Sequence, residues 1–287
     1  MARLLEGKPV AEQINERTYT LIEMLEERGI TPTLAIYRIG ADKSDVSYEK
    51  SIIKRCEELG IKTVKRLFDE EVTEEEFYDT LERDNRDDYI HGILVFRPLP
   101  EYFDQDMLRR RIDYRKDVDG CSDACLAGLF IIKNTDFVPC TAQSAMEILD
   151  YYDVDISGKN VVVIGRSLVI GKPISMLMLN KDATVTICHS RTKNIEQIAS
   201  KADILITAIG KPELIDKSYT NPNQTIVDVG VSWSEEKRKL VGDVKFDEVK
   251  DHVKDITPVP GGVGSVTTAI LLNHVVVAAI KLNDIQD

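Results

Sequence analysis

Short apolar stretches alternate with longer amphipathic ones along the first half of this chain, and this alternation constrains the fold more than any other feature. Stretches with the length of strands lie at 33–39, 62–68 and 92–96; the first and third are apolar, and the second mixes apolar with charged residues. The amphipathic stretches have the length of helices and lie at 9–29, 45–59 and 73–84. Strands separated by helices favour a mostly parallel sheet with helices on its faces.

The same alternation starts again near residue 158. Four further apolar runs have the length of buried strands, at 160–165, 183–188, 202–210 and 225–230. A linking helix is expected over 141–152, and a tail helix over 263–283 is expected to pack back on the first domain. We therefore predict a two-domain α/β protein. Its N-terminal α/β domain spans 1–148, and a Rossmann-type doubly wound parallel sheet spans 149–287.

Composition excludes several classes of protein. The net charge is −12, from 49 acidic against 37 basic residues, so a nucleic-acid partner is not expected. No secretory signal and no uninterrupted apolar run near the ~18 residues of a membrane span are visible, so no membrane partner is expected. The 5 cysteines are irregularly spaced, which indicates free thiols in the cytoplasm. Cys121 and Cys125 lack a second Cys/His pair at ligand spacing, so we expect no metal.

A glycine-containing loop follows the first strand of the second domain. It includes Gly165, Arg166, Ser167 and Gly171, and an apolar helix comes directly after it. Glycines there let backbone N–H groups approach a pyrophosphate, whose charge the helix N-terminus favours. The spacing differs from GxGxxG, so an ordinary tight turn is the alternative interpretation.

The strand that follows this loop ends at Cys188, and the next residues include Ser190 and Arg191. Sites that select NAD usually place an acid here to hold the ribose 2′-hydroxyl. Arg191 or Arg166 can instead hold a 2′-phosphate by charge-assisted hydrogen bonds. We predict NADP as the cofactor, with NAD as the alternative. An arginine that only extends from the loop into solvent would give the same sequence.

Five motifs stand out along the chain: KDVDG (116–120), PCT (139–141), GRS (165–167), HSRT (189–192) and TPVPGGVG (257–264). Together they resemble the methylenetetrahydrofolate dehydrogenase/cyclohydrolase (FolD) family, whose order they follow over nearly the whole chain. The resemblance implies a catalytic, folate-binding N-terminal domain, a nucleotide-binding Rossmann domain and a homodimer. The chemistry it implies is hydride transfer from 5,10-methylenetetrahydrofolate to a nicotinamide.

The resemblance also implies roles for particular residues. Tyr48 would stack over the folate, Asp119 would contact the pterin ring, and both are the catalytic candidates. Pro260, Gly261 and Gly262 would shape the same substrate pocket. Val231 would be a further cofactor-binding residue. The others are Gly165, Arg166, Ser167, Gly171, Ser190 and Arg191. Without the resemblance, Tyr48 would be interpreted as helix packing and Asp119 as a turn residue.

The chain departs from the family pattern at several positions, two of which are coupled. Residues 96–100 read FRPLP where the family has QLPLP, so Arg97 replaces a leucine, and Ala142, Ser144 and Ser265 replace the usual Pro, Gly and Pro. Four residues after Tyr48 the family carries a lysine, and Ile52 stands there; Phe96 stands where a glutamine partners that lysine. At about 100° per residue, Ile52 lies about 40° from Tyr48 on the helix, whereas Lys50 and Lys54 lie about 200° and 240° away. Replacing both polar members with apolar side chains avoids leaving one of them unpaired.

Since hydrolysis of the methenyl cation needs water activation and hydride transfer does not, we expect an NADP-dependent dehydrogenase with absent or weak cyclohydrolase activity. One alternative keeps both activities, through a bound water or a moved lysine such as Lys50. Another is a folate- or nucleotide-binding paralogue without turnover, against which the retained motifs argue.

Overall fold

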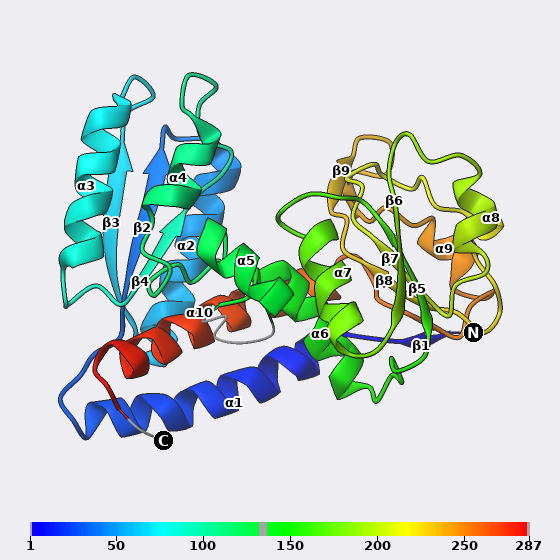
Figure 1. Cartoon of the computed structure of the whole chain (residues 1–287), viewed down its shortest axis with the longest axis horizontal. Coiled ribbons are helices and arrows are strands. Elements are labelled where there is room, and N and C mark those ends of the chain that lie inside the picture. The colour runs from blue at the N-terminus through cyan, green and yellow to red at the C-terminus, as the bar shows by residue number, and fades with distance from the viewer. Residues whose placement is uncertain (1, 132–136, 286–287) are drawn as a thin grey trace. The chain divides into compact units, whose positions relative to one another are not determined.

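The structure is a computed structural model that describes residues 2–131 and 137–285 (Figure 1). The chain divides into two compact units. The nucleotide unit, as we call it, comprises Met1–Gln13 and Thr141–Thr267, and the folate unit comprises Ile14–Cys140 and Thr268–Asp287. The domain boundary expected at 148/149 lies inside helix α6 (Cys140–Tyr151), at whose start the chain changes unit.

The folate unit is built on a three-stranded parallel sheet in the order β3-β2-β4. Its strands are β2 (Thr33–Ile39), β3 (Lys62–Phe68) and β4 (Gly92–Val95), which confirms the three predicted strands apart from the last residue of the third. Helices α2 (Lys43–Leu59) and α3 (Glu74–Arg86) connect them. Every residue of β4 and nearly every residue of β2 is buried, as strands covered on both faces should be.

Local signals in the sequence set the ends of these helices. The Asp42 side chain accepts a hydrogen bond from the Ser44 N–H at 2.8 Å and caps α2. Gly60 ends α2 in the left-handed region at φ 78°. The Thr73 hydroxyl accepts the Glu76 N–H at 3.2 Å and caps α3. Caps of this kind satisfy N–H groups that the first helical turn leaves unpaired.

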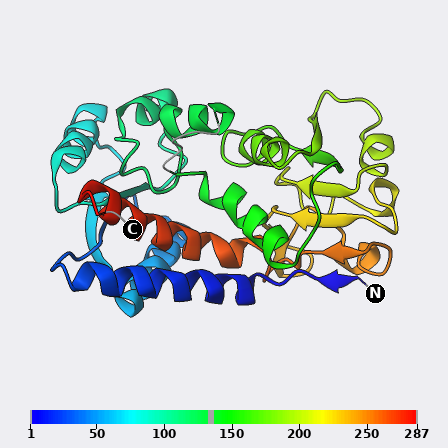
Figure 2. The same ribbon diagram turned by 60° about the horizontal axis from the view of Figure 1, so that its bottom comes forward.

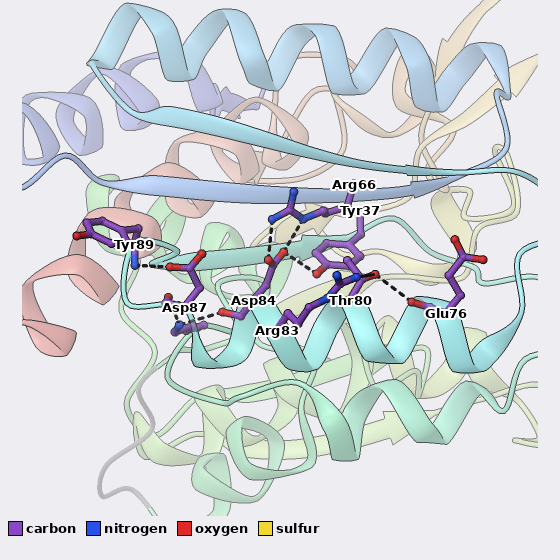
Figure 3. A network of polar contacts seen from close by, with 9 residues as sticks. Tyr37, Arg66, Glu76, Thr80, Arg83, Asp84, Asp87 and Tyr89 are labelled. Carbon is purple, nitrogen blue, oxygen red and sulfur yellow. Dashed lines mark hydrogen bonds and ion pairs between the residues drawn. The ribbon is translucent and has the colours of Figure 1, made fainter.

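A buried polar network joins α3 to the sheet (Figure 3). The Tyr37 hydroxyl of β2 donates to Asp84 at 2.6 Å, and Arg66 of β3 donates to both Asp84 oxygens at 2.9 and 2.7 Å. The Lys116 ammonium donates to the carbonyl oxygens of Asp84 and Asp87 at 3.0 and 2.7 Å. The Asp84 side chain is only 3% exposed, and both of its oxygens accept hydrogen bonds. The network thereby fixes α3 against β2 and β3.

The nucleotide unit contains a six-stranded parallel sheet in the order β1-β11-β8-β7-β5-β6. This confirms the predicted parallel Rossmann-type sheet, whose four expected strands are β5 (Asn160–Ile164), β6 (Thr184–Cys188), β7 (Ile204–Thr207) and β8 (Thr225–Asp228). The sequence analysis missed β1 (Arg3–Leu4) and β11 (Asp255–Ile256), since two residues carry no periodicity. The chain leaves β5 for β6 on one side and returns to β7 on the other, which creates a switch point at the ends of β5 and β7.

The remaining elements are short. Helix α7 (Gly171–Asn180) follows β5, and hairpin β9 (Ser232–Ser234) and β10 (Lys239–Val241) is antiparallel. The others are α4 (Gln105–Arg111), α5 (Asp123–Ile131), α8 (Ile195–Ala199), η1 (Lys217–Tyr219) and α9 (Phe246–Val249).

The tail helix is α10 (Val263–Leu282), and α1 (Gly7–Glu26) runs beside it in both views (Figures 1 and 2). Within the folate unit, Asn273 of α10 donates to the Thr18 hydroxyl of α1 at 3.0 Å. Although α10 has the length and hydropathy of a membrane span, 72% of its apolar window is buried inside the protein. It therefore serves as a core helix, which is why it is apolar on all sides.

Candidate active site

A buried ion pair positions the helix that carries Tyr48. Glu49, the next residue of α2, accepts from Arg38 of β2 at 2.6 Å, and their side chains are only 6% and 10% exposed. Lys65 of β3 adds a longer contact to Glu49, at 3.9 Å. Removing one member of such a pair leaves a buried charge uncompensated, so α2 is held firmly on the sheet. Tyr48 thus has a defined place beside the end of β4.

The Tyr48 ring contacts the ring of Phe96, the first residue after β4. Their centroids are 5.4 Å apart and their planes are inclined at 36°. Tyr48 is 41% exposed, whereas Ile52, one helical turn further on, has no exposed surface. Ile52 is thus covered by neighbouring side chains, while Tyr48 and Phe96 present an aromatic surface.

The two neighbouring lysines of α2 extend into solvent. Lys50 is exposed, and the Lys54 ammonium lies 3.8 Å from the Glu58 carboxylate on the helix surface. The Lys54 side chain is 77% exposed. Neither lysine shares the face of α2 that carries Ile52, in agreement with the helical angles.

The KDVDG segment folds into a tight loop that carries Asp119. Asp117 pairs with Ile93 of β4 through a parallel bridge, and its Oδ2 accepts the Ser122 N–H at 2.6 Å. Gly120 has φ 68°, and a side chain on it would meet the backbone of Pro139 and Val138 at 2.6 Å. Only glycine fits there, so the loop shape is specified at this residue.

Asp119 lies next to Arg97, with which it forms an ion pair. Burial raises the pKa of Asp119, the Arg97 charge opposes that rise, and the nearby Asp117 charge adds to it. Burial and the Asp119 charge also raise the pKa of Tyr48 to about 12, while Tyr48 shares a hydrogen bond with the Thr268 hydroxyl. Tyr48 is therefore protonated at neutral pH, when it can donate a hydrogen bond but cannot act as a base.

The five cysteines are buried and free, as expected. Cys140 lies nearest to the candidate site, where its thiol donates to Asp119 and to the Val118 carbonyl oxygen, the latter at 3.2 Å. Burial first, and then the Asp119 charge, raise the pKa of the Cys140 thiol. A neutral thiol is a poor nucleophile, so Cys140 is poorly suited to covalent catalysis.

The glycine loop of the nucleotide unit has little room for side chains. A Cβ on Gly165, at φ 132°, would meet the Ala208 carbonyl oxygen at 2.4 Å. A Cβ on Gly171 would meet the Gly165 carbonyl oxygen at 2.3 Å. The Ser167 hydroxyl accepts the Ile170 N–H at 3.2 Å and shapes the turn into α7. The backbone thus comes close to the place where a pyrophosphate binds at a helix N-terminus.

The loops after β5 and β6 emerge at the same edge of this sheet, because Ile164 pairs with Cys188. Arg166, Ser190 and Arg191 are exposed on these loops. The Arg191 N–H donates to His189 Nδ1 at 3.2 Å, so the turn that presents the arginine is ordered. Two guanidinium groups on neighbouring loops suit a phosphate ester.

Two buried carboxylates hold the loops after β7 and β8. Asp243 accepts N–H groups of 209–211 at 2.6 to 3.3 Å, and Asp228 accepts those of Gly230, Asp243 and Val244 at 2.9 to 3.1 Å. Burial and the Asp243 charge raise the pKa of Asp228 to about 6, although the Val244 N–H opposes this. Val231, one residue beyond Gly230, is 52% exposed.

Pro260, Gly261 and Gly262 belong to the nucleotide unit. The Gly7 N–H donates to the Gly261 carbonyl oxygen at 2.8 Å, and a Cβ on Gly262 would meet the Pro258 carbonyl oxygen at 2.5 Å. These residues therefore form a compact turn against the start of α1. Tyr48, Phe96 and Asp119 belong to the folate unit.

Sequence reasoning missed Arg97 and the Asp228–Asp243 pair. Arg97 stands where the family motif carries a leucine, so the departure itself was a visible signal. Asp228 and Asp243 are 15 residues apart and carried no signal, since their proximity depends on the register of the sheet and its hairpin.

Comparison with known proteins covers both units. Residues 5–119 match the model of the tetrahydrofolate dehydrogenase/cyclohydrolase catalytic domain, and residues 139–283 match the model of its NAD(P)-binding domain. A bifunctional protein FolD of Clostridium botulinum is 47% identical over 279 residues, which cover 97% of this chain and 99% of the relative.

Two solved structures have nearly the same fold. The bifunctional FolD enzyme of Campylobacter jejuni superposes with a TM-score of 0.95 at 37% identity, over 98% of this chain and 99% of that one. The Trypanosoma brucei dehydrogenase-cyclohydrolase (FolD), complexed with NADP cofactor and inhibitor, gives a TM-score of 0.91 at 33% identity, over 98% of each chain.

Proposed function

Since this chain belongs to the tetrahydrofolate dehydrogenase/cyclohydrolase (FolD) family, we propose that it oxidises 5,10-methylenetetrahydrofolate with NADP and hydrolyses the methenyl product weakly. The observation that carries the proposal is the grouping of Tyr48, Phe96 and Asp119 at the end of β4. An aromatic face beside a carboxylate suits a flat pterin that has N–H groups along one edge.

The demands of hydride transfer on the side chains are modest. A bound nicotinamide accepts the hydride, and the folate nitrogens stabilise the cation that remains. The side chains orient the substrate and exclude water: Asp119 would accept hydrogen bonds from the pterin, and Tyr48 would cover the ring. The high pKa of Tyr48, about 12, and the raised pKa of the Cys140 thiol fit a site without a nucleophile.

For the cofactor we favour NADP over NAD. Arg166 and Arg191 are exposed on adjacent loops. Ser190, which directly precedes Arg191 after the end of β6, is exposed as well. The Trypanosoma brucei relative was solved with NADP. Charge-assisted hydrogen bonds from two arginines would recognise a 2′-phosphate, which NAD lacks.

Weak hydrolysis is supported by the side chains at two positions. Ile52 is fully buried and Phe96 packs on Tyr48, so neither can bind or activate water. Lys50 and Lys54, the nearest lysines of α2, extend into solvent. Methenyl hydrolysis requires an activated water, and these residues offer no group for that step.

The second candidate function retains both activities. It is favoured by the relatives, because the Clostridium botulinum protein is named bifunctional and the Campylobacter jejuni structure is described as a bifunctional enzyme. A dehydrogenase-only chain and a bifunctional one share the first step, so only the fate of the methenyl product separates them. The homodimer and the cytoplasmic location implied by the sequence remain predictions beside both.

The dehydrogenase half is tested with purified protein, methylenetetrahydrofolate and either nicotinamide. We expect substrate-dependent growth of reduced-nicotinamide absorbance, with a higher kcat/KM for NADP than for NAD. The matched variant Asp119→Asn should lose most of this rate while keeping the fold. Absence of turnover with both cofactors, in protein that binds folate, would instead favour the non-catalytic paralogue.

A further inference from the structure

Arg97 and Asp119 form an ion pair at the centre of the folate unit's candidate site. An Arg97 guanidinium nitrogen, Nη2, donates to Asp119 Oδ2, and the two side chains are 31% and 25% exposed. Pairs on the protein surface contribute little, but water screens a partly buried pair much less. The orientation of the Asp119 carboxylate therefore depends on Arg97.

The groups around this pair make Arg97 more important, because they are negative or neutral. Asp117 is fully buried, and its Oδ1 has no hydrogen-bond partner among the described residues. Cys121 and Cys140 have thiol pKa values that burial raises well above their usual range, so both are uncharged. Tyr48 is also neutral. Arg97 is thus the cation that balances Asp119 and Asp117.

The direction of the pKa shifts agrees with this geometry. Burial by itself would lower the pKa of Arg97, but the Asp119 charge, the hydrogen bond to Asp119 and the Asp117 charge raise it overall. Burial raises the pKa of Asp119, and Arg97 is the group that lowers it most. Without Arg97, burial and the neighbouring Asp117 charge would act on Asp119 unopposed by that cation, and the pKa of Asp119 would rise further.

The position of this cation differs from that in the family pattern. The resemblance places a lysine where Ile52 stands and a leucine where Arg97 stands. Relative to the family pattern, a positive charge is thus missing from α2 and present at the end of β4, where Arg97 pairs with Asp119. Arginine stays protonated in proteins, so it can balance a charge but cannot exchange a proton with water.

We propose that Arg97 is a positioning residue of the folate site, which keeps the Asp119 carboxylate ionised and oriented for the pterin in place of a lysine on α2. The proposal rests on the proposed function in taking Asp119 as the pterin contact. With Arg97 balancing the Asp119 charge, the chain can bind folate without the lysine. Arg97 does not activate water, so hydrolysis of the methenyl product is not restored.

The test compares Arg97→Leu and Arg97→Lys with the unmodified protein across pH. In Arg97→Leu we expect KM for methylenetetrahydrofolate to rise about tenfold, with a smaller effect on kcat, because substrate binding is lost in ground and transition state alike. The acid limb of kcat/KM should move up by about one pH unit, as expected when a carboxylate loses its ion-pair partner. Arg97→Lys should retain most of both properties.

Two variants separate positioning from a merely structural role. Arg109 of α4 pairs with Asp106 and Asp123 on the surface, so Arg109→Leu is the matched control and should leave the pH profile unchanged. Arg97→Lys keeps a cation at the end of β4 and should hold the acid limb near its original pH. An unshifted limb in folded Arg97→Leu would contradict the proposal, as would an Arg97→Lys limb that moves as far as that of Arg97→Leu.

A measurement without turnover keeps this test independent of the proposed function. Carbon-13 labelling of aspartate carboxyls gives the titration of Asp119 by NMR, with Asp119→Asn for assignment. In Arg97→Leu the Asp119 midpoint should rise by about one pH unit or more. That rise in a protein without dehydrogenase activity would overturn the proposed function and leave the Arg97 pairing intact. An unchanged midpoint would overturn the pairing alone.

Discussion

The ring of Phe96 lies with its centroid 5.4 Å from that of Tyr48, inclined at 36°, and this contact joins the end of β4 to helix α2. It places an aromatic side chain where the family resemblance expects a glutamine. A phenyl ring can neither accept a lysine's hydrogen bond as a glutamine carbonyl does nor hold a water, so the surroundings of Tyr48 favour stacking over proton transfer.

Restoring both members of the lysine–glutamine pair should restore hydrolysis. Ile52→Lys alone should help little, because Ile52 is fully buried and desolvation would lower the pKa of an unpartnered lysine there. Ile52→Lys with Phe96→Gln should increase methenyl hydrolysis by more than the two single changes combined, since the groups work as a unit. The decay of methenyl absorbance over the uncatalysed rate measures this; additive effects would contradict the coupling.

Arg191→Ala should change cofactor preference. Loss of a charge-assisted hydrogen bond to a phosphate costs about 1.5–3 kcal/mol, so kcat/KM for NADP should fall about tenfold to a hundredfold. The value for NAD should stay within about twofold, because its ribose carries no 2′-phosphate. Lys193→Ala, two residues further along the same exposed loop, is the control. Equal losses for both cofactors would show that Arg191 acts on something other than the phosphate.

Asp84 should be important for stability. Its side chain is 3% exposed and is the acceptor for Arg66 and the Tyr37 hydroxyl (Figure 3). Asp84→Ala should lower the free energy of unfolding by about 3 kcal/mol, since it leaves a partly buried guanidinium and a buried hydroxyl unpaired. Glu82→Ala removes the exposed ion pairs of Arg86 and Arg111 and should cost under about 1 kcal/mol. Urea titration of both variants provides the comparison.

The pKa of Asp228, about 6 in the folded chain against 3.8 for an ordinary aspartate side chain, predicts a pH dependence of stability. Because the folded state binds this proton more tightly, stability from Asp228 is fully present below the lower value and is lost as pH rises through about 6. The loss should be about 2–3 kcal/mol. Asp228→Asn should lack it, so the unfolding free energies of the two proteins should diverge between pH 4 and 6, within the window those two pKa values set; parallel profiles would contradict the shift.

The elements that the sequence predicted are those whose signals are local. β2 and the four main strands of the nucleotide unit are apolar runs, and α3 starts at a Thr cap followed by acids. β1 and β11 have two residues each, and they pair across 252 positions of sequence, as Arg3 and Asp255 do. Their existence depends on the assembled sheet, so no local pattern predicts them.

The candidate site divides in the same way. Tyr48, Asp119 and the glycine loop were found because their motifs resemble a family. The Arg97–Asp119 pair was missed, although both residues are plain in the sequence, because a contact between residues 22 apart requires the KDVDG loop to lie beside β4. The burial of Ile52 was missed for a related reason: a helical angle gives the face of α2 and says nothing of what covers it.

The central claim, oxidation without efficient hydrolysis, is tested most directly by following both products in one reaction. Unmodified protein is given methylenetetrahydrofolate and NADP, and reduced nicotinamide and methenyltetrahydrofolate are measured together over time. A dehydrogenase with weak cyclohydrolase activity predicts equal molar growth of the two, with methenyltetrahydrofolate then decaying at the uncatalysed rate. Growth of reduced nicotinamide with little methenyltetrahydrofolate, and formyltetrahydrofolate in its place, would show a bifunctional enzyme and contradict the claim.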